Sequence, residues 1–183
     1  MHQEEIRFDR VLDWYRKDEF DSPTRSTIPL LDLIKNGNEM LQEIVHELGI
    51  EGEPSYHLEF GVEPPAGRGN PSQTDLWVQT KDQVLGIEAK WTERRYETVE
   101  TWLKRSNNPD NKRTVLHGWI GCLQQYSSNP LTIEGMKGQV YQMVHRAASV
   151  CSCKTNPILA YMLFTEELQP KENSYIYLVP CNI

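Results

Sequence analysis

The sequence lacks any long run of hydrophobic residues. No stretch of the 183-residue chain approaches the roughly 20 consecutive apolar residues that a membrane-spanning helix needs. The opening segment, MHQEEIRFDR, is polar and acidic and has no apolar core of the kind that a secretory signal carries. We therefore expect no membrane partner and a cytoplasmic location.

Cysteine is scarce and irregularly spaced. The four cysteines form no CxxC pair and no ladder typical of disulfide-rich domains, so reduced thiols are expected. A zinc site built from Cys151, Cys153, Cys181 and His145 is an alternative. Structural zinc sites usually combine two closely spaced ligand pairs, and only Cys151 and Cys153 are close here, so ordinary buried thiols are favoured.

The chain also lacks an excess of positive charge. It carries 19 Lys and Arg against 26 Asp and Glu, which gives a formal net charge of −7 and a pI of about 5.3. Proteins that coat nucleic acid by neutralising phosphates are usually basic, so this balance argues against a pure binding module. The densest basic region either lines the path of a polyanion or is a solvated surface, and it comprises Arg94, Arg95, Lys104, Arg105, Lys112 and Arg113.

Length, composition and periodicity indicate one globular α/β domain over residues 1–183, with residues 1–30 as an N-terminal helical extension. Apolar residues recur at helical spacing or alternate as in strands. The expected helices are two pieces within 29–48, divided near Asn36-Gly37-Asn38 and including Met40 in the apolar stripe, then 93–105, a segment around Trp119 to Tyr126, and 135–150. The expected strands are 55–61, 74–80, 83–91, ILAYMLF and YIYLVP, with polar loops at GVEPPAGRGNPSQ and RSNNPDNKR.

Three polar residues fall on one expected hairpin. Alternation along strand 83–91 puts Glu88 and Lys90 on the same face, and the tight Lys81-Asp82 turn folds the preceding strand back so that Asp75 lies beside them. Carboxylates and lysines are rarely buried unless they are paired or bind metal. Mg²⁺ prefers such oxygen ligands, and a bound metal can activate water for attack on a phosphate.

The pattern of Asp75 followed by Glu88-Ala89-Lys90 across a hairpin resembles the PD-(D/E)xK motif of restriction-endonuclease-like nucleases. The resemblance covers roughly residues 39–164. It implies a restriction-endonuclease-like core, a mixed β-sheet flanked by helices in the order αβββαβ. It also implies a Mg²⁺-dependent nuclease, with Mn²⁺ able to substitute, that hydrolyses phosphodiester bonds in nucleic acid, foremost DNA. A homodimer is compatible with the family.

The same resemblance assigns roles to individual residues. Asp75, Glu88 and the carbonyl of Ala89 would hold the metal, and Lys90 would orient or activate the attacking water. A further acidic residue is expected upstream, with Glu43 preferred over Glu47 or Glu59. Supporting roles are expected for Glu93, Gln139, Gln142 and Arg146. The chain departs from the motif at one position, because Thr74 precedes Asp75 and the nearest proline is Pro71.

Other interpretations accompany this one. The three hairpin residues can form an ordinary ion-pair patch, which contributes little to stability when exposed. Gln139, Gln142 and Arg146 can form the solvated face of a helix. A catalytically silent nucleic-acid-binding or scaffold protein of the same fold, and a hydrolase of another phosphate ester, are the alternative functions.

Overall fold

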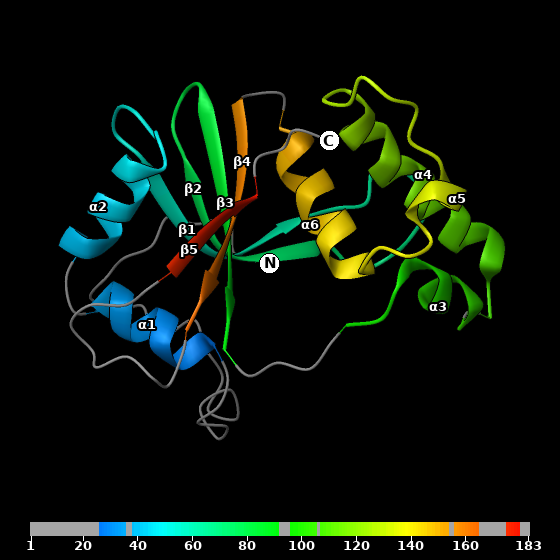
Figure 1. Ribbon diagram of the computed structural model, residues 1–183, viewed down its shortest axis with the longest axis horizontal. Helices are drawn as coiled ribbons and strands as arrows, with labels where there is room; N and C mark the ends of the chain where they lie inside the picture. Colours follow the sequence, from blue (N-terminus) through cyan, green and yellow to red (C-terminus); the bar gives the residue numbers. More distant parts are fainter. Residues whose placement is uncertain are drawn as a thin grey trace.

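The computed structural model describes residues 26–35, 38–91, 96–105, 107–153, 156–164 and 175–179. These residues form an α/β fold in three layers, in which a mixed β-sheet is covered by helices on both faces (Figure 1). The expected α/β class with helices flanking a mixed sheet is therefore confirmed. Residues 1–25, on which most of the expected N-terminal helical extension falls, lie outside the described residues.

The sheet has five strands in the order β1-β2-β3-β4-β5. All neighbouring strands are antiparallel except β3 and β4, which are parallel and align Glu88 with Tyr161. A parallel pair needs a crossover connection, and the helices between β3 and β4 supply it. The strands are β1 (Ser55–Val62), β2 (Ser72–Gln79), β3 (Gln83–Lys90), β4 (Asn156–Leu163) and β5 (Tyr175–Val179).

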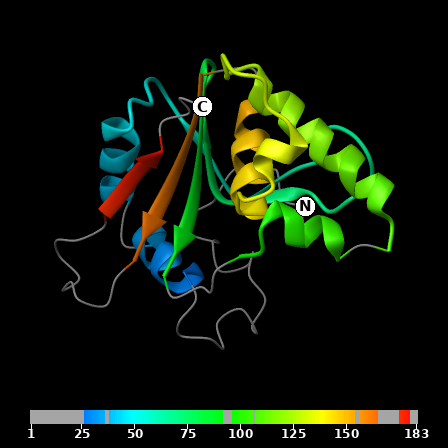
Figure 2. The same cartoon turned by 45° about the vertical axis from the view of Figure 1, so that its right-hand side comes forward.

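Two groups of helices lie on opposite faces of the sheet, which Figure 2 shows nearly edge-on. One face carries α1 (Thr27–Lys35) and α2 (Asn38–Glu47). The other carries the crossover helices α3 (Val99–Lys104), α4 (Pro109–Gln124), α5 (Ile133–Met136) and α6 (Tyr141–Cys151). None of the helices in these described segments is long and apolar enough to cross a membrane.

Strand β3 contributes to the packing on both faces of the sheet, because successive residues of a strand point to opposite faces. Leu85, Ile87 and Ala89 are fully buried and pack in the cluster under α1 and α2. Gly86 faces α6, where a Cβ added to it would meet Val150. Glu88 and Lys90 follow Gly86 at intervals of two, so they point toward the α6 side of the sheet.

The division of the first helical region into two pieces is confirmed, with α1 and α2 separated at residues 36 and 37. Helix α2 ends before Gly49, whose positive φ of 77° is the left-handed conformation that glycine tolerates best. Met40 was wrongly assigned to the apolar stripe, because it is 46% exposed. The neighbouring Leu41 is completely buried and takes the core position instead.

Two expectations about the crossover are wrong. The helix expected at 93–105 is described only over Val99–Lys104, and Thr98 before it forms a β-bridge with Val140. The segment RSNNPDNKR is not a loop throughout, because α4 starts at Pro109. Asn108 caps that helix by accepting a hydrogen bond from the backbone N–H of Asn111, and proline is favoured in the first turn.

The helix expected at 135–150 is also corrected. It is divided into the short α5 and the longer α6, with a turn and the bridged residue Val140 between them. The backbone N–H of Tyr141 donates to the carbonyl of Glu97, and that of Val99 donates to the carbonyl of Gln139. These long-range bonds hold the connection extended, which local helical periodicity does not reveal.

We predict that Gly86→Ala lowers the free energy of unfolding by about 1–3 kcal/mol, since overpacking a tight core forces strain. The new Cβ would lie 2.7 Å from Cγ2 of Val150 and 3.3 Å from Cγ2 of Thr74. Gly121→Ala is the control, because nothing lies within 4 Å of its added Cβ. In a helix that change stabilises by about 0.5–1 kcal/mol. Equilibrium urea unfolding measures both, and equal midpoints would contradict the close packing of α6 on β3.

Candidate active site

Glu88 and Lys90 lie together at the C-terminal end of β3. Nζ of Lys90 donates a hydrogen bond to Oε2 of Glu88 over 3.2 Å. The Glu88 side chain is 1% exposed and that of Lys90 is 17% exposed. This pair is therefore not the solvated surface patch that the sequence left open as an alternative.

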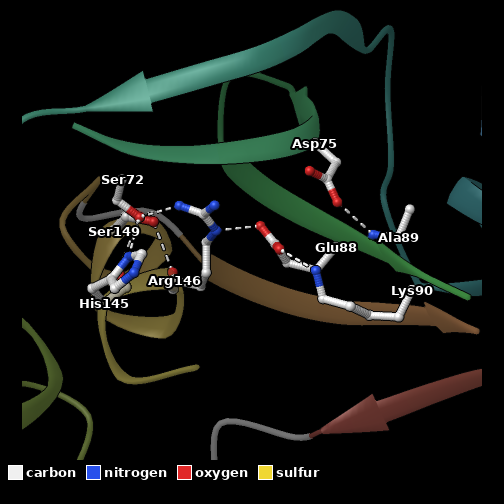
Figure 3. Close-up of polar contacts among 8 residues, drawn as sticks. All are labelled: Ser72, Asp75, Glu88, Ala89, Lys90, His145, Arg146 and Ser149. Carbon is white, nitrogen blue, oxygen red and sulfur yellow. Dashed lines mark hydrogen bonds and ion pairs between the residues drawn. The ribbon is translucent and has the colours of Figure 1, made fainter. Parts of the chain in front are cut away.

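Asp75 joins this pair because β2 separates from β3 at that point. The backbone ladder between the two strands ends at the Leu76–Ile87 pair. One residue further on, the Oδ2 of Asp75 accepts the backbone N–H of Ala89 at 2.8 Å (Figure 3). The carboxylate thus takes the place of a ladder carbonyl, and the expected convergence of Asp75, Glu88 and Lys90 is observed.

The strand on the other side of Asp75 is distorted at the matching position. Glu59 lies opposite Asp75 in the β1–β2 register and has a positive φ of 49°, which is uncommon for a non-glycine residue. The regular alternation of side chains breaks there. His57 and Phe60 contact each other edge to face at 5.6 Å, and Phe60 stacks on Trp77 at 4.5 Å. The backbone is therefore irregular at the two acidic positions, a feature that concentrates at functional sites.

Arg146 of α6 completes the cluster. Its Nε lies 2.5 Å from Oε1 of Glu88, and both groups are buried. The contact is ionic rather than an aligned hydrogen bond, since neither atom has a hydrogen-bond partner of good geometry. Glu88 therefore lies between two cations, Arg146 at one oxygen and Lys90 at the other.

The charges of the cluster shift its pKa values. Burial and the nearby charge of Asp75 raise the pKa of Glu88 to about 7, although Arg146 and Lys90 act in the opposite direction. Burial alone would lower the pKa of Lys90, but the charges of Asp75 and Glu88 outweigh it and the net shift is upward. Lys90 is accordingly an ammonium ion at neutral pH.

Ser72 and His145 extend the cluster away from Glu88. Nη1 of Arg146 donates to Oγ of Ser72 at 3.0 Å, and Oγ lies 2.8 Å from Nδ1 of His145. Burial and the charge of Arg146 lower the pKa of His145 to about 3, so the ring is neutral. The hydroxyl of Ser72 can then accept from Arg146 and donate to Nδ1 of His145, which leaves the imidazole proton on Nε2.

The sequence missed Ser72 and considered His145 only as a zinc ligand. Nothing in the local pattern marks Ser72, which was expected in a loop; the structure places it at the start of β2, 74 residues before Arg146 in the chain. The remaining predicted supports are not at the centre. Glu43 and Glu47 are exposed on α2, across the sheet from α6, and Gln139 is exposed in the turn before α6. Gln142 is half-buried on α6, and Glu93 lies outside the described residues.

The structure also places some of the residues of the zinc alternative and of the basic region. Cys151 is buried and Cys153 half-buried, and neither forms a disulfide with another described residue, while Cys181 lies outside the described residues. Of the basic region, Arg94 and Arg95 lie outside the described part of the chain. Lys104 pairs with Glu100 and Arg105 with Glu97, while Arg113 is exposed on α4.

The donor set fits a hard cation such as Mg²⁺. Among the described residues no group of three His, Cys, Asp or Glu side chains comes together, so the centre offers two carboxylates. Mg²⁺ is commonly held by one or two carboxylates, with water and phosphate oxygens completing its shell. Oε1 of Glu88 and the hydroxyl of Tyr161, which is aligned with Glu88 on β4, are both buried without an aligned hydrogen bond. A cation at Oε1 would compete with Arg146.

We predict that His145 makes the protein less stable in mild acid. Its folded-state pKa lies below the unfolded value, so its contribution is fully present above about pH 6.5 and is lost as pH falls toward 3. Between about pH 7 and pH 5 the loss attributable to this residue is about 2 kcal/mol. His145→Gln keeps a group that can bond Ser72 but does not titrate. Urea unfolding at both pH values should show a smaller loss for the variant, and an equal loss would contradict a neutral buried imidazole.

The comparisons with known proteins identify a family without giving it a function. Residues 9–177 match the family model described as "Domain of unknown function (DUF6946)". No curated protein matches the chain, and no solved structure does. The matched span contains Ser72, Asp75, Glu88, Lys90 and Arg146. Since the match covers most of the chain, the protein belongs to the DUF6946 family.

Proposed function

We propose that the protein is a metal-dependent nuclease that hydrolyses phosphodiester bonds, in the first place those of DNA. One observation carries the proposal: two carboxylates and an ammonium group meet where β2 and β3 separate, and one of the carboxylates is completely buried. Burying Glu88 costs free energy, and a second negative charge beside it raises that cost, although a neutral acceptor would serve the backbone contact of Asp75 equally well.

The topology supports a restriction-endonuclease-like core. The antiparallel run β1-β2-β3 is followed by a helical crossover and a parallel β4, and helices precede β1. This is the order αβββαβ that the resemblance implies. The meeting of Asp75, Glu88 and Lys90 at the open end of the β2–β3 hairpin supports the resemblance to the PD-(D/E)xK motif.

The proposed roles follow from the contacts. Asp75 and Glu88 would hold Mg²⁺, which when bound lowers the pKa of a water and neutralises charge on the phosphate. Lys90 is held by Glu88 and directs a positive charge into the same space, where it would stabilise the charge that develops on the phosphoryl oxygens. Asp75 also fixes the backbone at Ala89, which keeps the end of β3 in place.

Arg146 gives the site a second cation, and its guanidinium group contacts two different side chains. It contacts Glu88 through Nε and Ser72 through Nη1. A guanidinium released from Glu88 by an arriving metal would remain attached to Ser72 and would be available to a phosphate oxygen, which arginine binds well.

One observation favours the alternative function, a catalytically silent protein of the same fold. Both oxygens of Glu88 already contact cations, as in a structural ion-pair network. The two functions differ in metal binding and in cleavage, so the following experiments separate them.

We predict Mg²⁺- or Mn²⁺-dependent cleavage of plasmid or single-stranded DNA by the wild-type chain. Lys90→Gln should reduce the rate by roughly 100-fold, since it removes the charge that faces the developing phosphate charge. Lys81→Gln is the matched control, because Lys81 is exposed in the turn at the opposite end of the hairpin. Thermal unfolding verifies that both variants fold. Absence of cleavage of DNA and RNA under all these conditions would reject the nuclease.

We also predict opposite effects of two variants on metal affinity, measured by Mn²⁺ binding in electron paramagnetic resonance. Asp75→Asn should weaken binding, since the amide still accepts from Ala89 but has no charge. Arg146→Gln should tighten it by roughly tenfold, because a cation that competes for Glu88 is gone. Arg146→Lys keeps the charge and should stay near wild type. If neither charge-removing variant changes the affinity, the metal is bound elsewhere.

A further inference from the structure

A cavity of about 380 Å³ lies on the side of Arg146 where Ser72 and His145 extend the cluster. Its walls come from the loop between β1 and β2, from α3 and the first turns of α4, and from the start of α6. Ser72 and His145 belong both to this wall and to the polar chain that leads through Arg146 to Glu88. Its volume lies at the lower end of the roughly 300–1,000 Å³ found for small-molecule pockets, which suits one group of nucleotide size.

The lining of the cavity is cationic in an otherwise acidic protein. The chain as a whole has a net charge of −7, yet among the described residues the cavity is lined by Arg68 and Lys112 and by no Asp or Glu. Within the described segments, neither cation is paired with a carboxylate. Nζ of Lys112 donates to the carbonyl of Trp102, which leaves two of its three N–H groups for a ligand. The cavity therefore favours an anion.

The other part of the wall is aromatic. Trp102 and Tyr141 stack at 3.7 Å, and the Tyr141 ring lies 4.9 Å from that of His145. The Nζ of Lys112 lies 4.3 Å above the Trp102 ring. Aromatic rings beside cations form a site in which a planar apolar base and its phosphate are accommodated together.

The cavity is held in shape by the fold. The side chain of Asn111 accepts the backbone N–H of Arg68 at 2.9 Å and donates to the carbonyl of Arg68 at 2.7 Å. Gly67 lies so close to α4 that an added Cβ would be 2.8 Å from Val115. The loop that carries Arg68 is thus fastened to α4 through backbone contacts, so the site is largely formed before a ligand arrives.

We propose that this cavity binds the base and phosphate of a nucleotide next to the bond to be cleaved, in a single-stranded or unpaired segment of the substrate. The proposal rests on the proposed nuclease function for its relation to cleavage. A base inside a duplex is stacked and paired, and it enters an aromatic pocket only when it is unpaired. The substrate class is accordingly single-stranded nucleic acid or a frayed or flipped nucleotide.

Binding is tested with the full chain in buffer containing EDTA, so that the result does not depend on the metal centre. The probes are dAMP, deoxyadenosine and inorganic phosphate, and the binding of each is measured by isothermal titration calorimetry. We expect dAMP to bind more tightly than either fragment. Equal affinity of phosphate and dAMP would overturn the role of the base, and no binding by dAMP would overturn the site.

Two variants assign binding to the cavity. Arg68→Gln should weaken dAMP binding by roughly tenfold and leave deoxyadenosine unaffected, since the lost group is a charged hydrogen-bond donor. The backbone of Arg68, not its side chain, is hydrogen-bonded to Asn111, so the loop should remain in place. Arg113→Gln removes the same charge from α4 outside the cavity and should bind like wild type. Equal weakening by both variants would show a general charge effect and overturn the site.

The substrate class is tested with a fluorescent oligonucleotide, single-stranded or annealed into a blunt duplex, by anisotropy in EDTA. We expect the single strand to bind roughly tenfold more tightly and Arg68→Gln to remove most of the difference. Equal binding of the two forms would overturn the preference for unpaired bases. If the protein cleaves nucleic acid but does not bind dAMP, the proposed nucleotide site is rejected and the proposed nuclease function stands. If it binds dAMP but neither cleaves nucleic acid nor binds Mn²⁺, the nuclease function is rejected and the nucleotide site stands.

Discussion

The burial of the Glu88 carboxylate is the constraint on which this part of the structure depends. A charged group taken out of water needs partners, and breaking a buried ion pair costs about 3–5 kcal/mol. Arg146 and Lys90 provide those partners from α6 and from β3 itself. The position of α6 over the sheet is thus tied to Glu88 by charge as well as by the packing of Val150 against Gly86.

The opening between β2 and β3 is the second element of the arrangement. Paired strands leave no space for a ligand, because their backbone groups satisfy one another. Beyond Leu76 the strands separate, and the carboxylate of Asp75 replaces the missing ladder partner of Ala89. The same side chain that replaces this ladder partner therefore lies in the opening between β2 and β3, and the positive φ of Glu59 marks the matching irregularity on β1.

The proposed centre and the nucleotide cavity are joined by two side chains. Ser72 receives a hydrogen bond from Arg146 and contacts His145, which lines the cavity together with Tyr141. The burial that keeps His145 neutral lets it pack against aromatic rings without adding a charge. A carboxylate centre and a cationic cavity are thus connected, and the two proposals together would reconcile a net negative chain with an anionic substrate.

The sequence by itself determined the hairpin and its three polar residues. A period of two is a local property of a strand, so Glu88 and Lys90 could be assigned to one face, and a tight turn fixed the neighbourhood of Asp75. The apolar β4 and the break between α1 and α2 were equally local. Only the tertiary structure decided that Arg146 and Ser72 meet, that Val140 forms a bridge instead of continuing a helix, and that Arg68 and Trp102 line the same cavity. These contacts join segments far apart in the chain, and their partners are chosen by packing and charge rather than by any periodicity along the sequence.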